Sequence, residues 1–232
     1  MIAAAHSMAA TVIPILLLVL FAAGMIIDSV RRAHIKQQRV SELRSLAAQL
    51  DFEDFNPDRD EDFSTGWGFL SRLAQGQERY AYNILRGIYH EQSLFIFDYH
   101  YQTGAGKNKK EHYCTFLMLV CKECFPRMTI GPESFGAKIA AALGIENDIK
   151  FESAEFSRLF CVRSPDKKFA YDVCNPQMIE YLLANHGLQF EIQGPVIMLP
   201  FEPQLPVEQV EFNLRRLIEV WSRLPQYLFT NA

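Results

Sequence analysis

The residues of this chain that could do chemistry gather in one predicted β-hairpin, Leu94 to Cys121. Asp98 and His100 lie in its first strand, and His112 and Cys114 lie in its second. If His100 pairs with His112, then Asp98 pairs with Cys114, and four side chains able to bind zinc share one face. A shift of one residue in the pairing would move one strand's set to the other face. The sequence therefore predicts a metal site that depends on register, with a hydrogen bond between Asp98 and His112 as the structural alternative.

Two cysteines at the end of this stretch have a spacing used by zinc sites and by redox enzymes. Cys121 and Cys124 form a single CxxC pair, which is half of a zinc site. A thioredoxin-like pair follows a strand at a helix N-terminus, whereas Phe125 and Pro126 point to a loop or another strand. We interpret both as ordinary thiols flanking a turn. The odd total of five cysteines is typical of reduced thiols.

The turn of the predicted hairpin carries three lysines, Lys107, Lys109 and Lys110. The segment Gly104 to Lys107 does not belong to a phosphate-binding loop, because that motif needs a Ser or Thr where Asn108 stands and a helix where a strand follows. The lysines therefore form a small cationic tip. It is either a solvated turn or a contact for anionic lipid headgroups or for an acidic patch on a partner.

Two apolar runs on either side of the turn position these side chains. Phe95, Phe97, Tyr99 and Tyr101 recur at the two-residue period of a strand and form one aromatic face. Residues 113–121 are rich in the aromatic and β-branched types that favour strands. The glycines of the turn supply the positive φ angles that a tight reversal needs. We therefore expect the two runs to pair antiparallel.

An uncharged apolar run, residues 8–27, precedes these elements and has roughly the 20 residues that a helix needs to cross a bilayer. Arg31, Arg32, Lys36 and Arg39 follow it, and no Lys or Arg precedes it. The positive-inside rule places the N-terminus outside and the rest of the chain in the cytoplasm, as in a single-pass protein of the inner (plasma) membrane. A cleaved signal peptide is the alternative. It is disfavoured because no basic residue precedes the apolar run.

Two further segments separate this run from the hairpin. Residues 28–50 repeat apolar side chains at three- and four-residue intervals, which predicts a juxtamembrane amphipathic helix. Residues 51–66 begin with seven carboxylates up to Asp62 and predict a solvated acidic connector. A calcium loop does not fit there, because Phe63 and Phe69 stand where its Gly and its last Glu belong.

Residues 67–232 predict an α+β domain of antiparallel hairpins with packed helices. Leu159–Val162 and Lys168–Val173 predict a second hairpin, and residues 188–199 predict a third. A closing helix carries an apolar stripe that includes Val210, Leu214 and Leu217. The pattern allows a division into two lobes near residues 144–150.

The run from Phe97 to His112, FDYHYQTGAGKNKKEH, together with the apolar span, basic residues and helix before it, resembles an uncharacterised bacterial family of single-pass membrane-anchored proteins. The likeness covers Arg31 to Phe160, and its most specific part is the aromatic strand that leads into Thr103 to Asn108. The sequence departs from the family pattern at Asp51, where a Gly is expected. Because the family has no settled activity, the resemblance implies the anchored layout and carries over no catalytic residue.

Composition and charge narrow the function classes. The chain has 232 residues, of which 49% are hydrophobic, and a net charge of −4. These values are typical of a globular protein with a core and argue against a nucleic-acid binder. We predict a membrane-anchored cytosolic binding, scaffold or sensory module without chemistry of its own and without a cofactor. Residues 8–27 would contact the lipid bilayer, and the domain would contact a protein partner or a second copy.

The alternative prediction is a membrane-tethered enzyme. Its hydrolytic, thiol or metal site would be built around Asp98, His100, His112 and Cys114, the same four side chains that the register of the hairpin would have to bring together.

Overall fold

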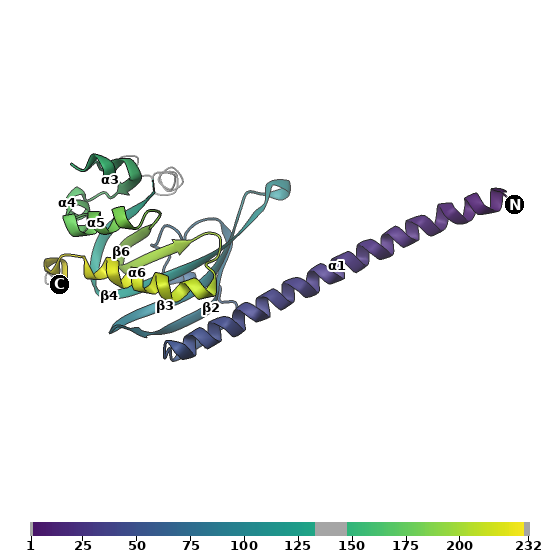
Figure 1. Ribbon diagram of the computed structural model, residues 1–232, viewed down its shortest axis with the longest axis horizontal. Helices are drawn as coiled ribbons and strands as arrows, with labels where there is room; N and C mark the ends of the chain where they lie inside the picture. The colour runs from purple at the N-terminus through teal and green to yellow at the C-terminus, as the bar shows by residue number, and fades with distance from the viewer. Residues whose placement is uncertain (1, 133–147, 230–232) are drawn as a thin grey trace. The chain divides into compact units, whose positions relative to one another are not determined.

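The computed structural model describes residues 2–132 and 148–229, with side chains described at residue 18 and in 20–63, 65–132 and 148–229. Its first element is the helix α1, Ile2–Gln49 (Figure 1). The predicted span 8–27 falls largely on positions whose side chains lie outside this description. Within the described residues, no helix combines the length and the apolar character needed to cross a membrane.

The chain divides into two compact units, Met1–Ser45 and Leu46–Ala232, and the second unit holds the elements described below. The predicted boundary between two lobes near 144–150 falls mostly on residues outside the described ranges. Residues 51–66, predicted as a connector, contribute part of the sheet, because Asp60 exchanges two backbone hydrogen bonds with Ala81.

A six-stranded antiparallel sheet forms the centre of the second unit, as the α+β prediction requires. Its strands are β1 (Asp54–Asn56), β2 (Gln77–Tyr89), β3 (Gln92–Thr103), β4 (Lys110–Pro132), β5 (Phe160–Arg163) and β6 (Phe190–Phe201). They are paired in the order β1-β2-β3-β4-β5, and β6 pairs with β4. The 23-residue β4 is long enough to pair with β3 in its first half and with β5 in its second, while β6 runs beside both halves.

The predicted central hairpin is confirmed as β3 and β4. Phe97 pairs with Phe116 and Thr103 pairs with Lys110, so the two strands are joined by residues 104–109, which include the short 3₁₀ helix η2, Gly106–Asn108. Gly104 has a φ of +75°, and a Cβ at this position would lie 2.3 Å from the carbonyl oxygen of Asn108. Only glycine fits this reversal.

One face of the sheet carries the aromatic row predicted from the sequence. Phe97 and Tyr99 are fully buried there, and the row packs against the chain that precedes β2, including the short 3₁₀ helix η1, Phe63–Thr65. Leu70 and Leu73, in the chain before β2, are buried members of this core. Burying side chains of this size stabilises the fold by roughly 1.5–3 kcal/mol each.

Helix α6, Val210–Ser222, packs against β4 and β6. Its buried residues Val210, Leu214 and Leu217 are the predicted stripe, and they recur at the helical period. The closing helix is therefore confirmed.

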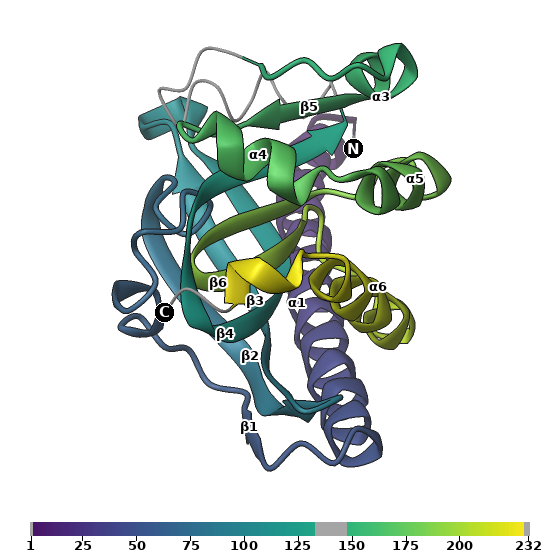
Figure 2. The same ribbon diagram turned by 90° about the vertical axis from the view of Figure 1, so that its left-hand side faces the viewer.

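Three short helices lie near the β5 end of the sheet (Figures 1 and 2). They are α3 (Ala154–Leu159), α4 (Lys167–Val173) and α5 (Pro176–Ala184). Each begins at a side chain that accepts a hydrogen bond from a backbone N–H of the first turn, namely Ser153, Asp166 and Asn175. The prediction of a strand over Lys168–Val173 is wrong, because the cap at Asp166 starts a helix that buries Phe169, Ala170 and Val173. The third predicted hairpin, residues 188–199, is also wrong, because the chain continues through Gly194 as the single strand β6 and pairs with β4 on both sides of it.

Candidate functional site

The register of the β3–β4 hairpin decides where the candidate metal ligands lie. His100 pairs with Tyr113 and Asp98 pairs with Thr115, one residue away from the predicted pairing. His112 and Cys114 instead pair with Tyr101 and Tyr99 and share their face. The predicted set of Asp98, His100, His112 and Cys114 is therefore divided between opposite faces of the sheet. Within the described part of the chain, no group of three or more His, Cys, Asp or Glu side chains is placed to hold a metal ion.

Asp98 lies on the face opposite His112, so the predicted hydrogen bond between them is also wrong. Its side chain is buried and accepts hydrogen bonds from Asn83 Nδ2 and Thr115 Oγ1, both at 2.8 Å. The Thr115 hydroxyl oxygen in turn accepts a hydrogen bond from the backbone N–H of Leu205 at 3.1 Å. Asp98 thus joins β2, β3, β4 and the segment after β6 through buried hydrogen bonds, which is a structural role.

His100 is buried between neighbouring side chains on the same face as Asp98. Its Nδ1 lies 3.0 Å from the carbonyl oxygen of Glu78, and its Nε2 contacts the carboxylate of Glu111. The ring stacks on Tyr80 at a centroid distance of 4.6 Å, and the Arg59 guanidinium lies 4.0 Å from the centroid of the Tyr80 ring. Both nitrogens of His100 are used in these contacts, so the ring is held in place rather than presented to a ligand.

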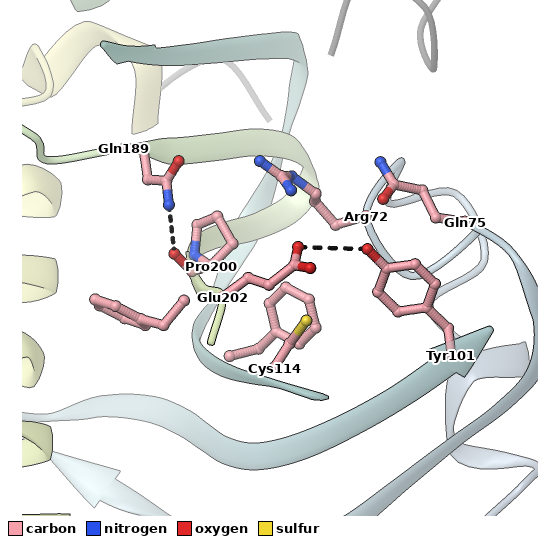
Figure 3. Close-up of a pocket in the computed structure, with 9 residues that line it drawn as sticks. Arg72, Gln75, Tyr101, Cys114, Gln189, Pro200 and Glu202 are labelled. Atoms are coloured by element: carbon pink, nitrogen blue, oxygen red, sulfur yellow. Dashed lines mark hydrogen bonds between the residues drawn. The ribbon is translucent and has the colours of Figure 1, made fainter. Parts of the chain in front are cut away.

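On the opposite face, His112 bridges three parts of the chain at the base of the hairpin. Its Nδ1 lies 2.7 Å from Glu202 Oε1, and its Nε2 lies 2.8 Å from Thr103 Oγ1. The ring stacks on Tyr101 with centroids 4.4 Å apart and an interplanar angle of 6°. The Tyr101 hydroxyl donates to Glu202 Oε2 at 3.4 Å (Figure 3). We call Tyr101, Thr103, His112 and Glu202 the hairpin-base network.

Sequence reasoning missed this network because Glu202 lies 90 residues from His112 in the chain. The two-residue alternation of aromatic side chains placed Tyr101 on the aromatic face. It could not show that the Tyr101 hydroxyl has a hydrogen-bond partner in the segment after β6. Burial raises the pKa of Tyr101, and the nearby Glu202 carboxylate adds to that effect. The Tyr101 hydroxyl therefore stays protonated and acts as a hydrogen-bond donor.

A small cavity adjoins the hairpin-base network (Figure 3). Its polar lining comes from Arg72, Gln75, Gln189 and Glu202, and Cys114 contributes a thiol. The cavity holds about 20 Å³, which is room for a water molecule and not for an organic substrate. Burial raises the pKa of Cys114 to about 12, so this thiol is not a thiolate at neutral pH and is a poor nucleophile.

A second buried carboxylate, Glu191 in β6, has no counterpart among the predicted site residues. Its Oε1 accepts hydrogen bonds from the backbone N–H of Ser71 at 2.9 Å and from the Ser71 hydroxyl at 2.8 Å. Burial raises the pKa of Glu191, and these hydrogen bonds and the positive charges of Arg127 and Arg72 oppose the rise. A charged residue between Phe190 and Ile192 in a predicted strand is the sequence signal that could have identified it.

The CxxC pair lies within β4, where the pairing with β6 is irregular. Cys124 is exposed and Cys121 is half-buried, and neither forms a disulfide. Burial raises the pKa of Cys121 to about 12, with a further contribution from Glu123. A strand interior and a raised pKa are the opposite of a reactive thiol pair at a helix N-terminus.

The lysine tip, Lys107, Lys109 and Lys110, is exposed at the end of the β3–β4 hairpin. Figure 1 shows that this hairpin end extends beyond the rest of the sheet. Lys109 forms an ion pair with Glu111, with Nζ and Oε1 3.3 Å apart. The structure thus places the predicted contact residues together, at the end of the hairpin that extends from the unit.

Comparison with known proteins supports the fold and leaves the family open. No family model matches the chain, and no curated protein matches it. The crystal structure of the mycobacterial trehalose monomycolate transport factor A, TtfA, is similar over 80% of this chain and 96% of that chain, with 17% sequence identity and a TM-score of 0.54. At this identity the likeness shows that the two chains share a fold.

Proposed function

We propose that this protein is a membrane-anchored accessory module that binds or holds a partner and carries out no chemistry of its own. The observation that carries the proposal is the use of its reactive side chains. The polar atoms of Asp98, His100 and His112 form hydrogen bonds within the fold. The cavity beside the hairpin-base network has room for about one water molecule. A catalytic site needs at least one such group facing a substrate-sized space.

The similarity in fold supports the accessory part of the proposal. The similar crystal structure is that of a protein named as a transport factor, which is a role that does not require a catalytic site. We extend only the accessory character to this chain.

The membrane anchor in this proposal rests on the sequence. Residues 8–27 contain no charged side chain, and Arg31, Arg32, Lys36 and Arg39 follow them. An apolar helix flanked on one side by basic residues inserts with that side in the cytoplasm. We therefore place the N-terminus outside the inner membrane and the Leu46–Ala232 unit in the cytoplasm.

Labelling of an introduced, exposed cysteine in intact cells tests this topology. Cys124→Ser removes the exposed native thiol, and Ser7→Cys or Gln226→Cys then introduces one reporter on either side of the proposed span. We expect a membrane-impermeant maleimide to label the Ser7→Cys reporter in intact cells and the Gln226→Cys reporter only after lysis. The reverse pattern contradicts the orientation, and extraction of the protein by alkaline carbonate contradicts the anchor.

A hydrolase is the second candidate, because one observation favours it. Thr103, His112 and Glu202 lie in the order of a nucleophile, a base and an orienting carboxylate, at distances of 2.8 and 2.7 Å. A fluorophosphonate or β-lactone probe distinguishes the two functions in the full chain. The accessory function predicts no adduct on Thr103, whereas an adduct that is absent in His112→Ala would establish the hydrolase.

A further inference from the structure

The lysine tip is a compact positive charge on a polar turn. Residues 103–113 contain Lys107, Lys109 and Lys110 and one carboxylate, Glu111. Glu111 contacts both His100 and Lys109, so it balances the charge near the base of the tip rather than at its end. Lys107 and Lys110 form no ion pair with the described residues. Their ammonium groups are available to an anionic partner.

The turn that carries these lysines is held in one shape. Asn108 donates its backbone N–H to the carbonyl oxygen of Ala105 at 3.1 Å, and Lys109 donates to that of Gly106 at 3.3 Å. Below the turn, Thr103 and His112 are joined across the two strands, and His112 is joined to Glu202 after β6. The lysines therefore stand on a turn fixed to the body of the unit, which lowers the ordering cost of any contact they make.

The side chains between the lysines indicate the kind of partner. The turn from Gly104 to Asn108 contains only Gly, Ala, Lys and Asn, without an aromatic or large aliphatic side chain. Protein hot spots are centred on buried aromatic, aliphatic or Arg anchors, and this turn has none. Exposed ammonium groups on a small polar turn instead match a diffuse layer of phosphate-bearing headgroups.

We propose that the lysine tip is a membrane contact of the anchored protein, and that it binds the anionic phospholipid headgroups of the bilayer that holds its N-terminal helix. This inference rests on the proposed anchor. Each lysine near an anionic surface strengthens binding about fivefold, so two or three lysines do not retain a free protein on a bilayer. In a chain that its N-terminal helix already holds at the bilayer, the contact is intramolecular, so the lysines do not have to supply the membrane affinity by themselves.

Energy transfer from the tip to labelled lipid measures this contact in the full chain. The protein carries Cys124→Ser and Ala105→Cys, is reconstituted in phosphatidylcholine vesicles with or without 30% phosphatidylglycerol, and is labelled with an impermeant donor dye. The acceptor is a headgroup dye in the outer leaflet. We expect transfer to be higher in the phosphatidylglycerol vesicles at 50 mM salt, and to fall to the phosphatidylcholine value at 500 mM salt because ions screen exposed charges.

Two double variants make the test specific. Lys107→Gln with Lys110→Gln should abolish the gain in transfer that phosphatidylglycerol causes. Lys122→Gln with Lys167→Gln removes the same charge from two other exposed lysines and should leave that gain unchanged.

Three outcomes would overturn the proposal. They are transfer that does not depend on phosphatidylglycerol, an equal loss in both double variants, and crosslinking of the tip to a protein instead of lipid in native membranes. Carbonate extraction of the same vesicles reports separately on the anchor. If the protein stays in the vesicles but energy transfer does not depend on phosphatidylglycerol, this inference alone is contradicted. If carbonate extracts the protein from the vesicles, the proposed anchor is contradicted.

Discussion

Truncation of Phe97 tests whether the aromatic face of β3 is part of the core of the Leu46–Ala232 unit. The side chain is fully buried, with ring centroids 4.7 Å from Phe63 and 5.4 Å from Phe116. Phe97→Ala removes the buried ring and leaves a cavity, which costs about 3–5 kcal/mol in protein cores. The cavity would lie between the sheet and the chain before β2, and neither layer can close it without moving several packed rings.

Urea unfolding of the 46–232 unit measures this change. We expect Phe97→Ala to lower the unfolding free energy by about 3–5 kcal/mol, and Phe97→Leu, which keeps much of the volume, to lower it by about 1–1.5 kcal/mol. Phe212→Ala is the matched control, because Phe212 is 56% exposed, and it should change stability by no more than about 0.5 kcal/mol. A loss below about 1 kcal/mol for Phe97→Ala, or equal losses for Phe97→Ala and Phe212→Ala, would refute the assignment of this face to the core.

Three further predictions concern packing, titration and thiol access. Gly87→Ala should destabilise the unit by about 1–3 kcal/mol in urea unfolding, because the added Cβ would lie 2.4 Å from the Phe52 ring. Gly66→Ala is the control: its Cβ would meet nothing closer than 4.0 Å, and its stability should be nearly unchanged. Burial raises the folded-state pKa of Glu191, so this carboxyl binds a proton more tightly in the folded chain than in the unfolded chain. The unfolding free energy should therefore rise as the pH falls from 7 toward the ordinary carboxyl pKa. Glu191→Gln should remove this dependence on pH. In native protein, Ellman's reagent should react quickly with one thiol, that of Cys124, and with the other four thiols only on unfolding. A fast reaction of a second thiol would contradict this prediction, because it would show that a half-buried or buried cysteine is accessible.

The hairpin could be predicted from the sequence, but its register could not. The two-residue alternation of Phe95 to Tyr101 fixes which residues of β3 share a face. It says nothing about which residues of β4 join them, because that depends on the number of residues in the connection. Residues 104–109 contain a 3₁₀ turn, and Thr103 therefore pairs with Lys110. A connection one residue shorter would have paired His112 with His100.

The helix α4 shows where a short apolar pattern is ambiguous. Phe169, Tyr171 and Val173 alternate as in a strand, and Phe169, Ala170 and Val173 also follow the spacing of one helical face. In a seven-residue segment the two patterns cannot be separated by periodicity. The side chain of Asp166 separates them in the structure, because it caps the first turn by accepting from the backbone N–H of Phe169 at 3.0 Å.

The contacts that define the candidate site join residues far apart in the chain. Ser71 and Glu191 are 120 residues apart, and His112 and Glu202 are 90 residues apart. The sequence around a residue can show that a charged side chain lies in an apolar strand. It cannot show which distant residue forms a hydrogen bond with that side chain in the folded chain. Long-range pairing through β6 is therefore the part of the site that only the structure provides.

The same register that divides the predicted zinc ligands explains why the hairpin base is polar and its tip is cationic. Because His112 shares a face with Tyr101, it can stack on that ring and reach Glu202 at 2.7 Å beyond β6, which joins the hairpin to the sheet at its last covered position. Beyond this point, residues 104–111 are exposed. Lysines suit such a position, since an exposed strand end with apolar side chains would pair or aggregate. The same exposed lysines are the side chains that would meet an anionic surface near which the chain is held, and the lipid experiment varies the charge of that surface.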